Sequence, residues 1–188
     1  MAPVATPVDV EPADVRDAVV DLGAGTDADS RAQYTTDRHD VGVDFVFDLR
    51  DEWPFADGSL SGLIARHVFE HFTHDELREH VFPEARRVLK PGGWLELRVP
   101  LGSDLVTDPT HRSTWAWRTP LFYDDGHRHW TGKTGFELEE RRLHVWMITP
   151  LGVFTPAIRF CAKHWPMEFW YELPGATGEL ICRYESRK

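Results

Sequence analysis

The 188-residue sequence is poor in cysteine and in long apolar runs, and each shortage excludes a class of protein. Its two cysteines, Cys161 and Cys182, are too few for a disulfide framework or a cysteine metal cluster, so we expect both to be reduced and buried. No apolar run approaches the length of a membrane span, and the first residues lack the basic and apolar regions of a signal peptide. We therefore expect a cytoplasmic protein without a membrane span.

Positive charge is also scarce. The 21 Lys and Arg residues face 31 Asp and Glu residues, which gives a formal net charge of -10 at pH 7. Binding to nucleic acid needs concentrated Lys and Arg, so the composition argues against a nucleic-acid partner. An acidic surface with little lysine also suits a salt-rich cytoplasm.

Length and local composition predict a simple domain organisation. A chain of this size fits one domain and is long enough to bury a core. Residues 1–10 show little apolar periodicity and contain prolines, which predicts a flexible tail. We expect residues 11–188 to form a single domain in which residues 101–135 supply a substrate-binding or lid segment.

A glycine turn near the amino terminus is the first candidate binding site. Val-Val-Asp-Leu at residues 19–22 predicts a buried strand, and Gly-Ala-Gly-Thr follows at residues 23–26. At the carboxyl end of a strand in an open α/β sheet, such glycines let a ligand approach the main chain. Because Gly-x-Gly also occurs in ordinary strand-to-loop turns, its context decides what it means.

The motifs that follow supply this context. Asp37 and Asp48 close two further short strand-like runs, His-Val-Phe-Glu-His stands at residues 67–71, and Arg-Val-Leu-Lys-Pro-Gly-Gly stands at residues 87–93. In this order and at this spacing, the series resembles the class I S-adenosylmethionine-dependent methyltransferases, especially their small type 11-like branch. The resemblance implies a Rossmann-like α/β fold. It would be a three-layer sandwich with about seven mostly parallel strands, the last one antiparallel.

The resemblance also implies S-adenosyl-L-methionine as the cofactor and a small or carrier-linked methyl acceptor, which the sequence does not identify. Asp21 would orient the turn and the methionine amino group, and Asp37 would accept hydrogen bonds from the ribose hydroxyls. Asp48 and Leu49 would hold the adenine. The residues assigned to the cofactor in this way are Asp21, Gly23, Ala24, Gly25, Asp37, Asp48, Leu49 and His67.

Two features near the turn depart from the family pattern. The interval between Thr26 and Tyr34 is too short for a full crossover helix, which predicts a stunted first helix. Asp27 occupies the place where many members have a third glycine. One alternative function is therefore a cofactor-impaired binding or interaction protein of the same fold.

The second alternative is an NAD-dependent oxidoreductase. Gly23, Gly25 and Ala28 satisfy the dinucleotide fingerprint G-x-G-x-x-G/A. That fingerprint places its ribose-binding acid about twenty residues further on, after a complete helix. Asp37 comes too early, so the sequence favours the methyl donor.

The His-Val-Phe-Glu-His motif admits a metal interpretation. His67, Glu70 and His71 share one face if the segment is helical, and H-x-x-E-H is the inverted zinc-protease signature. A metal site would need the motif within a helix and a third ligand supplied by the fold, whereas here the motif straddles the end of a strand. We expect no metal, and we expect Glu70 and His71 to hold the loop that follows them.

Substrate residues are expected in the aromatic-rich and histidine-rich stretch after residue 103. His111, within Asp-Pro-Thr-His, is the first choice for a general base, and His67 is the second. An aromatic lid over the methyl group would draw on Trp115, His127 and His129. The alternative is that these rings pack as ordinary core.

Further elements follow from local patterns. Thr73 and Glu76 form a capping-box sequence before a helical apolar pattern that ends at Pro91-Gly92-Gly93. The sequence also predicts strands at residues 94–100, 136–147 and 179–184, and partly helical structure at residues 151–165.

Overall fold

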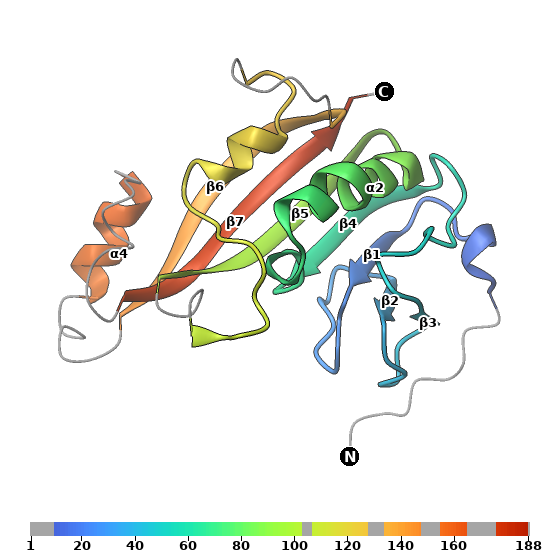
Figure 1. The fold of residues 1–188 in the computed structure, drawn as a ribbon, viewed down its shortest axis with the longest axis horizontal. Coiled ribbons are helices and arrows are strands. Elements are labelled where there is room, and N and C mark those ends of the chain that lie inside the picture. The colour runs from blue at the N-terminus through green and yellow to red at the C-terminus, as the bar shows by residue number, and fades with distance from the viewer. Residues whose placement is uncertain (1–9, 103–106, 128–133, 148–154, 165–175, 188) are drawn as a thin grey trace.

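A computed structural model of the chain describes residues 10–102, 107–127, 134–147, 155–164 and 176–187. These residues build a seven-stranded sheet (Figure 1). The strands are β1 (Val19–Leu22), β2 (Tyr34–Asp37), β3 (Phe45–Val46), β4 (Leu60–Arg66), β5 (Leu89–Gly102), β6 (Phe136–Met147) and β7 (Ala176–Ser186).

The strand order is β3-β2-β1-β4-β5-β7-β6. The first five strands of this order pair in parallel, whereas β7 is antiparallel to both β5 and β6. The predicted α/β fold with a mostly parallel sheet and an antiparallel last strand is confirmed. The chain continues from β1 to β2 on one side, and β4 lies on the other. The carboxyl ends of β1 and β4 therefore form the switch point at which such sheets bind ligands.

The helical segments are short. They are η1 (Pro12–Asp14), η2 (Phe69–His71), α1 (His74–Glu76), η3 (Leu77–Val81), α2 (Phe82–Val88), η4 (Thr119–Tyr123) and α4 (Thr155–His164). α1, η3 and α2 follow one another without a break and form the helix predicted after Thr73. The predicted capping box is present, because Thr73 Oγ1 accepts a hydrogen bond from Glu76 N–H and the Glu76 carboxylate accepts one from Thr73 N–H.

The main core lies between the sheet and α2, which crosses one face of it (Figure 1). Leu63 of β4 and Leu95 of β5 point to this face and are fully buried. Phe82 of α2 is the centre of an aromatic cluster. Its ring contacts those of Phe69, Tyr123, Phe136 and Tyr184.

The opposite face of β4 and β5 is polar. Side chains alternate along a strand, so Glu96 and Arg98 point away from the core face. The loop at residues 23–33 covers them through Arg31, and this loop contains no helix. The first helix, predicted to be stunted, is absent from this loop.

The predicted elements beyond residue 135 are confirmed where the structure describes them. β6 matches the predicted strand, β7 contains the predicted residues 179–184, and α4 lies within residues 151–165. No helix within the described ranges has the length and apolarity to cross a bilayer.

The two cysteines differ in environment. Cys182 is buried in β7, as predicted, and burial raises the pKa of its thiol. Cys161 in α4 is partly exposed, so the prediction that both thiols are buried is wrong for Cys161. The predicted tail, apart from Val10, lies outside the described residues.

Candidate functional site

A pocket of about 480 Å³ lies at the carboxyl edge of the parallel strands. Its size is within the range of about 300–1,000 Å³ that is common for small-molecule sites. The segments that follow β1, β2, β3 and β4 all contribute to its wall. Five of the residues predicted to bind the cofactor line this pocket, namely Gly23, Asp37, Asp48, Leu49 and His67.

The glycine turn has the backbone geometry that only glycine adopts readily. Gly23 and Gly25 have φ angles of 64° and 56°. A Cβ atom on Gly23 would lie 2.6 Å from Val68 Cγ2, so the turn also packs tightly on the segment after β4. Ala24 and Gly25 stand behind the wall, where Ala24 N–H donates to the Thr36 carbonyl.

Asp37 joins β2 to the glycine turn. Its Oδ2 accepts a hydrogen bond from Gly25 N–H at 3.1 Å, and its Oδ1 accepts one from His39 N–H at 2.9 Å. A carboxylate oxygen can accept more than one hydrogen bond, so Asp37 keeps acceptor capacity toward the pocket. Asp48 lies across the pocket after β3, and its Oδ1 accepts from Arg50 N–H.

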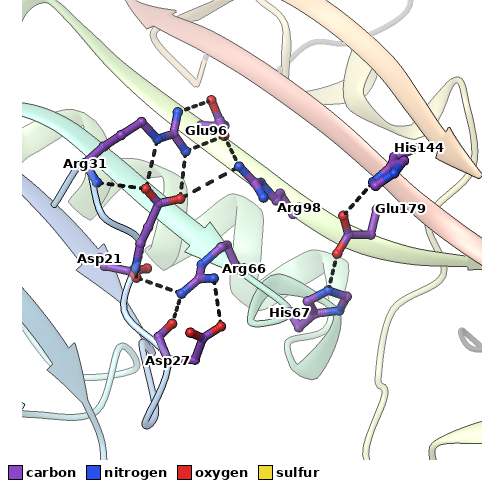
Figure 2. A network of polar contacts seen from close by, with 10 residues as sticks. Asp21, Asp27, Arg31, Arg66, His67, Glu96, Arg98, His144 and Glu179 are labelled. Carbon is purple, nitrogen blue, oxygen red and sulfur yellow. Dashed lines mark hydrogen bonds and ion pairs between the residues drawn. The ribbon is translucent and has the colours of Figure 1, made fainter. Parts of the chain in front are cut away.

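Asp21 does not line the pocket. Its buried Oδ2 accepts from Asp29 N–H at 2.7 Å and pairs with Arg66 at 3.2 Å (Figure 2). Burial raises the pKa of Asp21, while the Asp29 N–H and Arg66 oppose the rise. Arg66 also contacts Asp27, whose carboxylate is 95% exposed. Asp21 therefore holds Asp29 in the loop after the glycine turn, and the geometry gives no support to the predicted contact with a methionine amino group.

A second group of ion pairs covers the polar face of the sheet (Figure 2). Arg31 contacts both the Asp29 and the Glu96 carboxylates, and Arg98 reaches the same two acids. Hydrogen bonds from Arg31 lower the pKa of Asp29. Burial opposes ionisation of Glu96, but the two arginines outweigh it and lower its pKa.

His67 stands at the edge of the pocket between two acids. Its Nε2 lies 2.7 Å from Glu179 Oε1 of β7, and its Nδ1 lies 3.5 Å from Glu70 Oε1. Hydrogen bonding to Glu179, then to Glu70, raises the pKa of His67 to about 9. The ring is therefore protonated at neutral pH, which does not suit the predicted role of His67 as a base. Glu179 also faces His144 at 3.8 Å (Figure 2).

His111 lies next to the pocket wall. Its ring meets that of His71 edge to face at 5.1 Å, and His71, Thr110 and Arg112 line the pocket. Glu70 O accepts hydrogen bonds from Arg112 N–H and Ser113 N–H. Glu70 and His71 thus hold the loop at residues 110–113, about forty positions along the chain, rather than the loop that directly follows them.

The predicted aromatic lid has a different arrangement. Trp115 is 2% exposed, stacks on Tyr123, and donates from Nε1 to Ser113 Oγ, so it belongs to the core. The alternative interpretation of the rings as core holds for Trp115, and its prediction as a substrate residue is wrong. His127 contacts Phe122 and does not line the pocket. His129 lies outside the described residues.

Several pocket residues were not predicted from the sequence. Arg50 lines the pocket after β3, lies over the Phe72 ring and donates to the His71 carbonyl. Arg112 pairs with Glu76 at 2.9 Å. Arg50 could have been found from the sequence, because it directly follows the predicted adenine residues Asp48 and Leu49. Glu179, the partner of His67, has no such sequence signal, because its place beside His67 depends on the pairing of β7 with β5.

Comparisons with known proteins agree with the fold. Residues 14–97 match the family model described as a methyltransferase domain. A search of curated proteins finds no match. A Bacillus halodurans C-125 protein assigned provisionally as a methyltransferase is 17% identical, with a TM-score of 0.59, over 94% of this chain and 96% of that one. An S-adenosylmethionine-dependent methyltransferase from Archaeoglobus fulgidus is 13% identical, with a TM-score of 0.58, over 94% and 88%.

A third similar structure is a complex between the Haloferax volcanii Trm112 methyltransferase activator and its provisionally assigned methyltransferase. The match is 20% identical, with a TM-score of 0.54, over 95% of this chain and 85% of that one. Similarity at these identities shows the fold alone, while the family match concerns the sequence itself. Residues 14–97 therefore match a methyltransferase domain in sequence, and the described residues have the fold of these methyltransferase structures.

Proposed function

We propose that the protein is an S-adenosylmethionine-dependent methyltransferase that acts on a small or carrier-linked acceptor. The observation that carries the proposal is the pocket at the switch point. Four consecutive parallel strands lead to the residues that the family resemblance assigns to the cofactor, namely Gly23, Asp37, Asp48, Leu49 and His67. A cytoplasmic location and the absence of a nucleic-acid partner remain part of this proposal.

The residues present fit a nucleoside cofactor. Asp37 offers carboxylate oxygens to the ribose hydroxyls, and Gly23 lines the same pocket wall. Phe47 and Leu49 supply an apolar wall for an adenine ring, and Asp48 offers an acceptor for its amino group.

The departure at Asp27 does not place a carboxylate in the pocket. Asp27 is turned toward Arg66, on the polar side of the sheet, and is absent from the pocket wall. This position supports a working cofactor site over the cofactor-impaired alternative.

S-adenosylmethionine, when bound, supplies a methyl carbon activated by its sulfonium. The chain then has to align an acceptor and exclude water. His67, His71, Thr110 and Arg112 line the wall beyond the glycine turn and would face the acceptor. For a hydroxyl acceptor, His111 remains the predicted base, since an imidazole suits proton removal near neutral pH.

The test is calorimetric titration of S-adenosylhomocysteine into wild type, Asp37→Ala and Asp40→Ala, at low and at high salt. Asp40 is exposed and does not line the pocket, so its variant is a matched control. We expect micromolar binding by wild type and Asp40→Ala. Asp37→Ala should bind at least about tenfold more weakly, because it loses a charged hydrogen-bond acceptor.

The alternatives predict different titrations. Folded wild type that binds no S-adenosylhomocysteine at either salt overturns the proposal and favours an interaction protein. Binding of NAD without binding of S-adenosylhomocysteine favours the oxidoreductase. After cofactor binding, a screen of acceptors for a mass gain of one methyl group identifies the substrate.

A further inference from the structure

Glu70 carries a buried carboxylate with little to neutralise it. The residue is 0% exposed, and apart from the long contact with His67 neither Oε1 nor Oε2 has a hydrogen-bond partner among the described residues. Among the residues that the structure describes, His67 is the ion-pair partner of Glu70, and its Nδ1 lies 3.5 Å from Oε1. A buried acid of this kind is costly unless a further partner satisfies it.

Two imidazoles lie beside this carboxylate. Ligand atoms of Glu70, His71 and His111 all lie within 4.8 Å of one another. Glu70 and His71 share the single turn of η2, and His111 comes from a loop about forty positions further along the chain. That loop is held against η2 by the hydrogen bonds from Arg112 N–H and Ser113 N–H to Glu70 O, at 2.7 and 3.1 Å.

Both imidazoles have outer partners of the kind that orient metal-binding histidines. His71 Nδ1 lies 3.3 Å from the Thr110 carbonyl oxygen, to which it can donate, and this leaves Nε2 as the ligand atom. His111 Nε2 lies 3.7 Å from Asp108 Oδ2. Ligating histidines commonly direct their second nitrogen to a carbonyl or carboxylate, which fixes the ring.

We propose that Glu70, His71 and His111 bind a divalent transition-metal ion of the zinc class. Of the His-Val-Phe-Glu-His motif, Glu70 and His71 belong to this group and His67 does not, and the structure brings in His111 as the third member. One carboxylate and two imidazoles are a common ligand set for catalytic zinc, which keeps a fourth position open.

Modest side-chain movement would complete the site. Ligand atoms of a tetrahedral zinc ion lie about 3.4 Å apart when the bonds are about 2.1 Å long. The present upper limit of 4.8 Å therefore requires a closure of about 1.4 Å at most. Backbone hydrogen bonds already hold η2 and the loop at residues 110–113 together. Rotation of the His71 and His111 rings can therefore provide this closure without movement of the main chain.

The ion would lie at the acceptor side of the pocket, because His71 lines the pocket wall. Its open position would then bind an oxygen or nitrogen of the acceptor, and His111 would be a ligand rather than a base. This catalytic role rests on the proposed function, whereas metal binding itself does not.

The test uses full-length protein freed of metal with EDTA and titrated with zinc chloride, with cobalt(II) as a spectroscopic probe. We expect one zinc ion per wild-type chain and the visible bands of tetrahedral cobalt. His111→Gln and Glu70→Gln should weaken zinc binding at least about a hundredfold. Asp108→Asn, which alters an outer partner, should weaken it about tenfold to a hundredfold.

His80→Gln is the matched control. The His80 imidazole donates from Nε2 to the Asp51 carbonyl and does not belong to the group of Glu70, His71 and His111. Circular dichroism establishes that each variant is folded. Folded wild type that binds no zinc, or unchanged zinc binding in folded His111→Gln, overturns the metal site. S-adenosylhomocysteine titration of the EDTA-treated protein separates this result from the proposed function, because cofactor binding there does not require the metal.

Discussion

Arg31 places its guanidinium on the Glu96 carboxylate through contacts of 3.0 and 2.8 Å, although 65 positions separate the two residues. Arg31 belongs to the loop between β1 and β2, and Glu96 lies in β5. The loop is too short for a crossover helix, so the polar face of the sheet is covered by ion pairs instead. The Trp94 ring adds to this cover, because the Arg31 guanidinium lies 6.0 Å from its centre.

The first prediction concerns this pair. Glu96→Gln removes the charge from a side chain that is 3% exposed and leaves Arg31 with Asp29 alone. Breaking a buried pair costs several kcal/mol, but Arg31 is 41% exposed and solvent screens part of the loss. We expect a decrease of about 1–2 kcal/mol in the free energy of unfolding, measured by urea denaturation.

The matched control is Asp75→Asn, which alters an exposed pair with Arg78. Surface pairs contribute about 0–1 kcal/mol, so this variant should unfold close to the wild-type midpoint. Equal stability of Glu96→Gln and wild type would show that the bridge does not hold the loop on the sheet.

The second prediction separates the cost of backbone strain from the cost of a steric clash with Val68 at the glycine turn. Gly23→Ala combines a positive φ with a Cβ atom 2.6 Å from Val68, whereas Gly25→Ala has a positive φ and no atom within 4 Å of its Cβ. We expect Gly25→Ala to lose about 1 kcal/mol of stability and Gly23→Ala to lose about 1–3 kcal/mol more.

Thermal and urea unfolding measure both variants. Their difference reports the packing of the turn on Val68 rather than the backbone strain they share. If the two variants prove equally stable, the close approach of the turn to Val68 has no energetic consequence.

Local sequence patterns predicted most of the fold. The capping box at Thr73, the strand that ends at Asp37 and the strand at residues 136–147 all depend on periodicity or on residues close in sequence, and all three appear in the structure. The same holds for Gly23, Asp37 and Asp48 in the pocket, since each stands at the end of a strand or within two positions of it.

Contacts between distant segments could not be predicted in this way. The bond between His67 and Glu179 spans 112 positions and requires the antiparallel pairing of β7 with β5. His111 approaches Glu70 only because a loop folds back onto η2. Trp115 was misassigned because an aromatic ring in a turn-rich segment has the same sequence signature whether it lines a pocket or fills the core.

The third prediction distinguishes the two thiols. Cys182 is buried and burial raises the pKa of its thiol, so little thiolate forms at neutral pH. Cys161 is partly exposed. We expect one thiol per native chain to react with a disulfide reagent and two after denaturation, with the native reaction abolished in Cys161→Ser. Rapid reaction of a thiol in native Cys161→Ser would contradict the buried position of Cys182.

The last prediction concerns pH. Backbone hydrogen bonding from Thr73, assisted by Arg50 and Arg112, lowers the pKa of Glu76 from 4.5 to about 2. Because the folded-state pKa lies below the unfolded value, ionised Glu76 stabilises the fold above about pH 4.5, and this contribution is lost as the pH falls toward 2.

Glu76→Gln keeps the shape of the side chain and removes the titration. We expect the variant to be less stable than wild type by about 1 kcal/mol at pH 7, a typical value for a helix cap. The difference should shrink when denaturant unfolding is repeated at pH 3.5, because the unfolded wild-type chain then binds a proton at Glu76 that the folded chain does not. A stability difference that stays constant between the two pH values would mean that the Glu76 charge contributes nothing, leaving only the loss of its hydrogen-bond geometry.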